Sequence, residues 1–199
     1  MSTLTNRTEL PKLFAEKGFN RGAEIGVFGG YFSELLCKNI PGLTLICVDI
    51  CGHGKYKAAE DEARQLLKDY DTIIIKDYSV EAAKDIPDES LDFVYIDGAH
   101  DYDNVKADIK AWAPKVKIGG IIAGDDFYSF PSGKGGVMQA VTEYTSHHHY
   151  DLKITEWDID NPVRDDRQPS FWFVKTHNKG PQHPHERKDF DGFRSCKYR

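Results

Sequence analysis

The chain has 199 residues, of which 40% are apolar and 29% are charged, and its formal net charge is −6. This length fits a single domain with a substantial core, and the acidic balance argues against a nucleic-acid-binding protein. No apolar run approaches the ~20 residues that span a bilayer, and the N-terminus lacks the apolar segment of a signal peptide.

The four cysteines show no disulfide framework, so we expect a cytoplasmic protein with no membrane contact. From His177 to Arg199 there are six Lys or Arg against three Asp or Glu, which makes this end of the chain basic. We therefore divide the sequence into a domain over 1–176 and a basic C-terminal tail over 177–199.

Strand-like and helix-like segments alternate along the chain. Apolar runs predict strands at 22–27, 43–48, 72–76, 91–96 and 118–123, and helical spacing predicts helices at about 8–18, 31–40, 56–70, 80–86 and 102–113. A helix over 137–146 and two strands without an intervening helix, 152–158 and 170–175, follow. The pattern predicts an α/β fold: a single-domain, doubly wound, Rossmann-like sheet of seven strands, mostly parallel, with one antiparallel strand in a C-terminal β-hairpin.

Acidic residues end two successive predicted strands. Asp97 and His100 follow the strand 91–96, and Asp125 and Asp126 follow the strand 118–123. A right-handed crossover would place both ends at one edge of the sheet, where oxygen ligands suit Mg²⁺ and an imidazole can accept a proton. The alternative is a group of solvated strand ends without a ligand.

A glycine-containing loop follows the first predicted strand. Gly26 and Gly30 would let a ligand approach the backbone, and Asp49, at the end of the second strand, is placed to hold a ribose. Glu24 lies inside the first strand, where a carboxylate needs a cationic partner such as an α-amino group. NAD is an alternative ligand, but the glycine spacing favours a nucleoside without a diphosphate.

These residues carry a resemblance to a known family. The residues that match are Glu24-x-Gly26-x-x-x-Gly30, Asp49, Asp77-Tyr78-Ser79 and Asp97. They resemble the class I S-adenosylmethionine-dependent methyltransferases over about residues 20–175. Three stretches, 95–102, 119–126 and 136–141, are similar to the metal-dependent, macrocin-type sugar O-methyltransferases.

The resemblance implies a role for each candidate residue. Glu24 would meet the amino group of the methionine moiety, Gly26 and Gly30 would allow close approach, and Asp49 would bind the ribose. Tyr78 and Ser79 would flank the adenine. Asp97, which also lies beside the donor, would bind Mg²⁺ together with Asp125 and Asp126, and His100 would be the catalytic base.

The predicted function is therefore transfer of a methyl group from S-adenosylmethionine to one hydroxyl of a vicinal diol. The predicted acceptor is a sugar or glycoside, and a catechol-like small molecule is the alternative. Two further alternatives are a NAD-binding reductase and a non-catalytic binding module. Homo-oligomers are compatible with the sequence.

Overall fold

The computed structural model describes residues 4–50, 55–129 and 135–177, and these contain a seven-stranded sheet. The predicted tail, apart from its first residue, lies outside the described residues. The strands are β1 (Arg21–Ile25), β2 (Thr44–Asp49), β3 (Thr72–Lys76), β4 (Leu91–Ile96), β5 (Val116–Gly124), β6 (Lys153–Ile154) and β7 (Phe171–Val174).

The strand order is β3-β2-β1-β4-β5-β7-β6, and the first five strands in this order are parallel. Only β7 runs against the others, since it is antiparallel to both β5 and β6. The predicted fold class is thus confirmed. Because the chain order reverses between β1 and β4, a crevice is expected at the carboxyl ends of these two strands.

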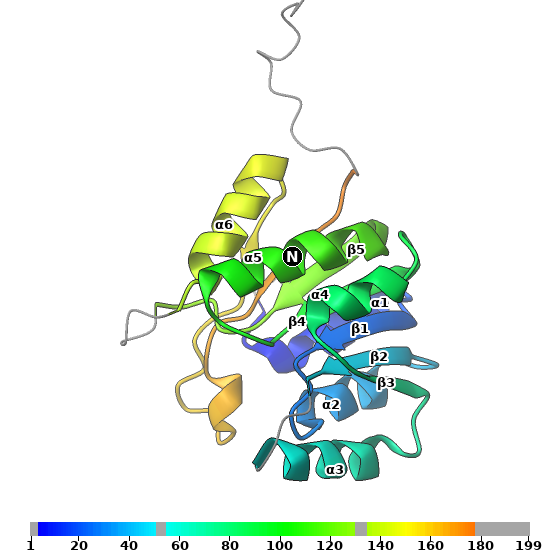
Figure 1. Ribbon diagram of the computed structural model, residues 1–199. Helices are drawn as coiled ribbons and strands as arrows, with labels where there is room; N and C mark the ends of the chain where they lie inside the picture. Colours follow the sequence, from blue (N-terminus) through cyan, green and yellow to red (C-terminus); the bar gives the residue numbers. More distant parts are fainter. Residues whose placement is uncertain (1–3, 51–54, 130–134, 178–199) are drawn as a thin grey trace, which may run out of the picture.

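Helices cover both faces of the sheet (Figure 1). The helices on one face are α1 (Leu10–Glu16), α2 (Tyr31–Asn39) and α3 (Lys55–Leu67). Those on the other face are α4 (Ser79–Ala82), α5 (Tyr102–Trp112) and α6 (Val137–His148). Each layer buries its own apolar cluster against the sheet, as a doubly wound fold requires.

The central residues of strand β2 are apolar because both faces of the strand are covered. Leu45 and Cys47 pack toward α1–α3, whereas Ile46 and Val48 pack toward α4–α6. Successive side chains of a strand point to opposite faces, so a strand covered on both sides needs an unbroken apolar run. The four central residues are buried, and the polar end residues Thr44 and Asp49 are partly exposed.

The predicted strand over 152–158 is too long, because β6 contains only Lys153 and Ile154. Beyond Thr155 the chain leaves β7 and pairs with the N-terminal segment instead, since the Glu156 N–H donates to the Leu4 carbonyl. Further along, Asp166 pairs with Arg7, which also pairs with Asp125 after the end of β5. Within the described ranges, no helix combines the length and apolar character that crossing a bilayer requires.

Candidate functional site

The loop after β1 approaches the loop after β4 very closely. Gly26 has φ +88°, and a Cβ there would lie 2.1 Å from the carbonyl oxygen of Asp97. Gly30, also at positive φ, is the N-cap of α2 and packs against Ala63. The two glycines therefore fix the shape of the loop between β1 and α2 and bring it against Asp97.

Asp49 holds this loop from the neighbouring strand. Its Oδ2 accepts hydrogen bonds from the backbone N–H groups of Val27, at 2.8 Å, and Phe28, at 2.9 Å. Phe28 has φ +49° and is 60% exposed, a strained and open arrangement for a large apolar side chain. Asp49, the residue predicted to bind the ribose, thus also fixes the backbone conformation of the glycine loop.

Glu24 is buried in β1 and accepts a short hydrogen bond from the Ser33 hydroxyl in α2. Burial raises the pKa of Glu24 to about 8, because desolvation disfavours the carboxylate more than the Ser33 hydrogen bond favours it. Without a cationic ligand, Glu24 is therefore largely protonated at neutral pH. A ligand's ammonium group beside it would favour the charged form.

Replacing Glu24 by Gln is expected to remove a pH-dependent loss of stability. The folded protein keeps the Glu24 proton up to a pKa of about 8, whereas the unfolded chain releases it near 4.5, so stability falls as pH rises through this window. We expect Glu24→Gln to match the parent at pH 5 and to exceed it by about 4 kcal/mol at pH 8.5 in urea unfolding. Glu16→Gln, an exposed change on α1, should show no such difference. A parallel pH dependence in parent and Glu24→Gln would contradict this assignment.

The two predicted adenine neighbours differ in their surroundings. Tyr78 is 71% exposed at the start of α4 and lies open to a ligand. The Ser79 hydroxyl accepts a 2.8 Å hydrogen bond from the indole N–H of the fully buried Trp112. Ser79 therefore already links α4 to α5, in addition to any role beside a ligand.

Asp97, His100 and Asp126 come together at the ends of β4 and β5, and we call them the strand-end trio. His100 Nδ1 lies 3.0 Å from Asp126 Oδ2, and its Nε2 lies 3.7 Å from Asp97 Oδ1. One ligand atom from each side chain falls within 4.8 Å of the others, close enough to share one metal ion. Hydrogen bonds from the imidazole to the carboxylates of Asp126 and Asp97 raise the pKa of His100 to about 10, so its charged form is favoured at neutral pH.

Asp125 is not a member of the strand-end trio, although it shares Arg7 Nη1 with Asp97. It is 5% exposed, and its two oxygens accept hydrogen bonds from the Ser170 hydroxyl and from Arg7 Nη1, both at 2.7 Å. Burial and the neighbouring Asp97 raise the pKa of Asp125 to about 7, and Arg7 opposes this rise. Consecutive side chains leave an extended chain on opposite sides, and Asp126, at φ +57°, turns toward His100.

Arg7 is the main site residue that sequence reasoning missed. Its Nη1 also lies 3.2 Å from Asp97 Oδ2, and its Nε donates to Asp166 Oδ1 at 2.6 Å. Asp166 in turn accepts from the Tyr31 hydroxyl at 3.1 Å. These contacts join positions up to 159 apart in sequence. No local pattern around Arg7 indicates them.

Aromatic side chains stand beside the strand-end trio. The rings of Tyr128 and Trp157 pack edge to face, with centroids 5.3 Å apart, and Trp157 is 53% exposed. Tyr128 follows Asp126 by two residues, so this pair lies on the same edge as the trio. It offers an apolar surface to a flat ring.

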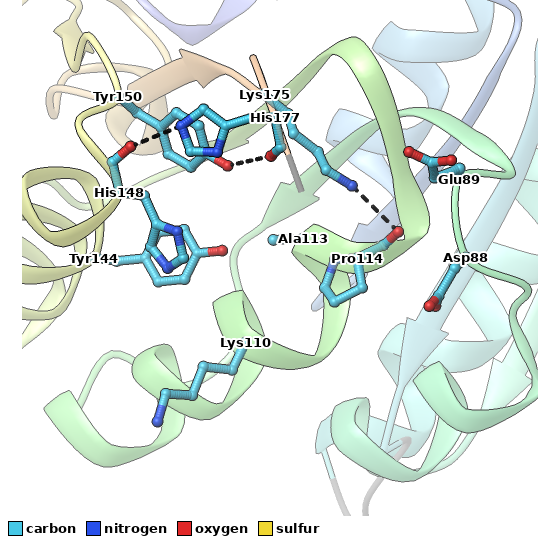
Figure 2. A pocket seen from close by; sticks show the side chains of 10 residues that line it. All are labelled: Asp88, Glu89, Lys110, Ala113, Pro114, Tyr144, His148, Tyr150, Lys175 and His177. Carbon is cyan, nitrogen blue, oxygen red and sulfur yellow. Dashed lines mark hydrogen bonds between the residues drawn. The ribbon is translucent and has the colours of Figure 1, made fainter. Parts of the chain in front are cut away.

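A cavity of about 510 Å³ lies at the opposite edge of the sheet. Figure 2 shows the rings of Tyr144, His148, Tyr150 and His177 along one side of it. Pro114 and Glu89 mark it as the amino edge, because they precede β5 and β4. The ring contacts and the 2.6 Å hydrogen bond from Lys175 to the Val116 carbonyl are packing within the fold, so we place the chemistry at the carboxyl edge.

A family model described as a methyltransferase domain matches residues 23–127, more than half of the chain. The matched segment begins in β1 and ends just after Asp126, so it contains the glycine loop and the strand-end trio. No curated protein sequence matches this chain.

Solved structures share the fold at low sequence identity. Cofactor-bound Rv0187 from MTB has a TM-score of 0.69 at 16% identity, over 86% of this chain and 79% of that one. The O-methyltransferase from Bacillus cereus in complex with SAH has 0.66 at 17%, over 84% and 80%. The O-methyltransferase TomG from Streptomyces achromogenes, involved in tomaymycin synthesis and solved with SAM, has 0.63 at 14%, over 86% and 80%.

Proposed function

We propose that this chain, which belongs to the methyltransferase domain family, transfers a methyl group from S-adenosylmethionine to a hydroxyl oxygen of a small molecule. The observation that carries the proposal is the convergence of Asp97, His100 and Asp126 beside the loop that starts at Gly26. The SAH and SAM bound in two neighbours of the same fold support the choice of donor.

The donor is assigned to the crevice between β1 and β4. Asp49 would hold the ribose hydroxyls, with the glycine loop passing over the donor and exposed Tyr78 covering the adenine. Ser79 would lie at the far side of the adenine. Glu24 would take up the charged form on meeting the donor's ammonium group, since an adjacent cation lowers a carboxyl pKa.

The acceptor is assigned to the space between the strand-end trio and Trp157. A vicinal diol would place one oxygen near His100 while its ring packs on the indole. We propose a sugar or glycoside, and the aromatic pair of Tyr128 and Trp157 makes a catechol-like ring the second candidate. A cytoplasmic location and a homo-oligomeric state stay predictions.

The strand-end trio fits a hard divalent cation, because it brings two carboxylates and an imidazole within 4.8 Å of one another. We propose that Asp97 and Asp126 would hold Mg²⁺. Asp125, the third predicted ligand, would reach the ion only by releasing Arg7. An ion in this place supplies Lewis acidity, which lowers the pKa of a hydroxyl that it binds.

In the proposed mechanism, the chain aligns two reactants and moves one proton. The glycine loop and Asp49 fix the donor, whose sulfonium supplies an activated methyl group. His100 would accept the acceptor's hydroxyl proton, and a cation on Asp97 and Asp126 would offset the carboxylate charges that otherwise raise the pKa of His100. The oxygen then forms a bond to the methyl carbon as the bond from carbon to sulfur breaks.

Donor binding and methyl transfer test this function directly. S-adenosylmethionine and SAH are expected to raise the melting temperature of the protein, and NAD is expected to leave it unchanged. A screen of glycosides and catechols, run with Mg²⁺ and with EDTA, should then give a methylated product that needs the ion. Stabilisation by NAD alone would indicate a reductase, and donor binding without transfer to any acceptor would indicate a binding module.

A further inference from the structure

Arg7 places a permanent positive charge inside the acidic edge of the sheet. Its side chain is 6% exposed and contacts the carboxylates of Asp97, Asp125 and Asp166 at 3.2, 2.7 and 2.6 Å. Its guanidinium also lies 5.3 Å from the centroid of the Phe32 ring. A guanidinium does not lose its proton in proteins, so this charge is present at every working pH.

These contacts divide the strand-end carboxylates into two groups. Both oxygens of Asp125 are engaged, one by Arg7 and the other by Ser170. Arg7 also occupies Asp97 Oδ2, whereas Asp97 Oδ1 faces His100. Arg7 and Ser170 therefore leave Asp97 Oδ1 and the carboxylate of Asp126 to face His100, whose Nδ1 lies 3.0 Å from Asp126 Oδ2.

The N-terminal segment holds Arg7 in this position. Asn6 caps the short 3₁₀ helix η1 (Arg7–Glu9) by accepting a hydrogen bond from the Thr8 N–H. The Asn6 amide donates to Asp158 Oδ2 at 2.6 Å, which ties the segment to the loop between β6 and β7. Arg7 is thus fixed from both sides, by its carboxylate partners and by its own backbone.

We propose that Arg7 is a positioning residue that keeps Asp125 out of the metal site and weakens the binding of a divalent cation to the strand-end trio. The inference rests on the proposed function, because it concerns the ion assigned to Asp97 and Asp126. A fixed charge bonded to one oxygen of Asp97 repels a cation bound to the other oxygen, and partial burial strengthens this repulsion. Removing the charge both relieves the repulsion and frees Asp125 as a ligand.

Calorimetric titration with Mn²⁺ tests the proposal without an activity measurement. Arg7→Gln is expected to bind Mn²⁺ at least fivefold more tightly than the parent, and Arg7→Lys, which keeps the charge, is expected to stay within about twofold. Arg64→Gln, which breaks an exposed pair with Glu60 on α3, is the matched control and should not change the affinity. Equal or weaker Mn²⁺ binding by Arg7→Gln would overturn the proposal.

A second measurement uses the unaltered protein, in case Arg7→Gln does not fold. The Arg7 Nε–H donates to buried Asp166, so its NMR signal should lie apart from those of exposed arginines. We expect titration with Mg²⁺ to leave this signal in place. Its collapse to the position of exposed arginines would show that the ion displaces Arg7, and the proposal would fail.

Failure of the proposed function has a different signature. If the parent takes up no Mn²⁺ and methyl transfer proceeds in EDTA, the metal-dependent part of the proposed function is wrong. If Arg7→Gln binds Mn²⁺ although the parent does not, the proposed role of Arg7 in excluding the ion is still supported. If neither protein binds Mn²⁺, the proposed role of Arg7 is refuted.

Discussion

Replacing His100 by Ala is expected to lower methyl transfer by about 10²- to 10⁴-fold without weakening Mn²⁺ binding by more than a few-fold. Within the strand-end trio, the imidazole is the group that would accept a proton at neutral pH when a cation offsets the charges of Asp97 and Asp126. Asp97→Asn should lose both turnover and ion binding, because Asp97 is a proposed ligand of the ion. Initial rates with saturating donor, together with calorimetry, measure both quantities.

Two comparisons make this result specific to the site. His147→Ala, an exposed change near the end of α6, should leave both turnover and ion affinity unchanged. A loss of Mn²⁺ binding by more than tenfold in His100→Ala would make the imidazole a ligand instead of a base. Turnover within a few-fold of the parent would remove His100 from the mechanism.

Replacing Gly26 by Ala is expected to destabilise the protein by about 4 kcal/mol and to abolish donor binding. The added Cβ would lie 2.1 Å from the Asp97 carbonyl oxygen, so the loops after β1 and β4 must separate. The positive φ of Gly26 adds a conformational cost of about 1–2 kcal/mol. Urea unfolding measures the loss, and a thermal shift with SAH measures donor binding.

Gly42→Ala separates these two costs. Gly42 also has a positive φ, of +68°, but a Cβ there would meet nothing within 4 Å. It should therefore lose only about 1–2 kcal/mol and bind SAH normally. Equal losses in the two variants would show that the close approach to Asp97 does not matter.

Sequence patterns predict most of this fold because apolar periodicity reports burial directly. The strands 72–76 and 91–96 have the predicted bounds, and the apolar run of β2 is buried on both faces as expected. The length of β6 could not be predicted. Its end depends on hydrogen bonds with the N-terminal segment, which lies more than 150 residues earlier in the chain.

The candidate site is predictable only where neighbours in sequence act together. Asp97 and His100 share one loop, and strand order places Asp126 beside them. By contrast, the pair of Asp125 and Asp126 looks uniform in sequence, although its side chains diverge toward Arg7 and His100. Whether Asp125 is available to a ligand depends on Arg7, which lies 118 residues away in the sequence. No spacing rule can identify such a partner.

A crystal structure with SAH and Mn²⁺ tests the central claim most directly. We expect SAH between the loop at Gly26–Gly30 and Asp49, and an anomalous Mn²⁺ peak on Asp97 and Asp126 next to its sulfur. SAH bound elsewhere, such as in the cavity beside Tyr150 and Lys175 (Figure 2), or a strand-end trio without Mn²⁺, would contradict the proposed site.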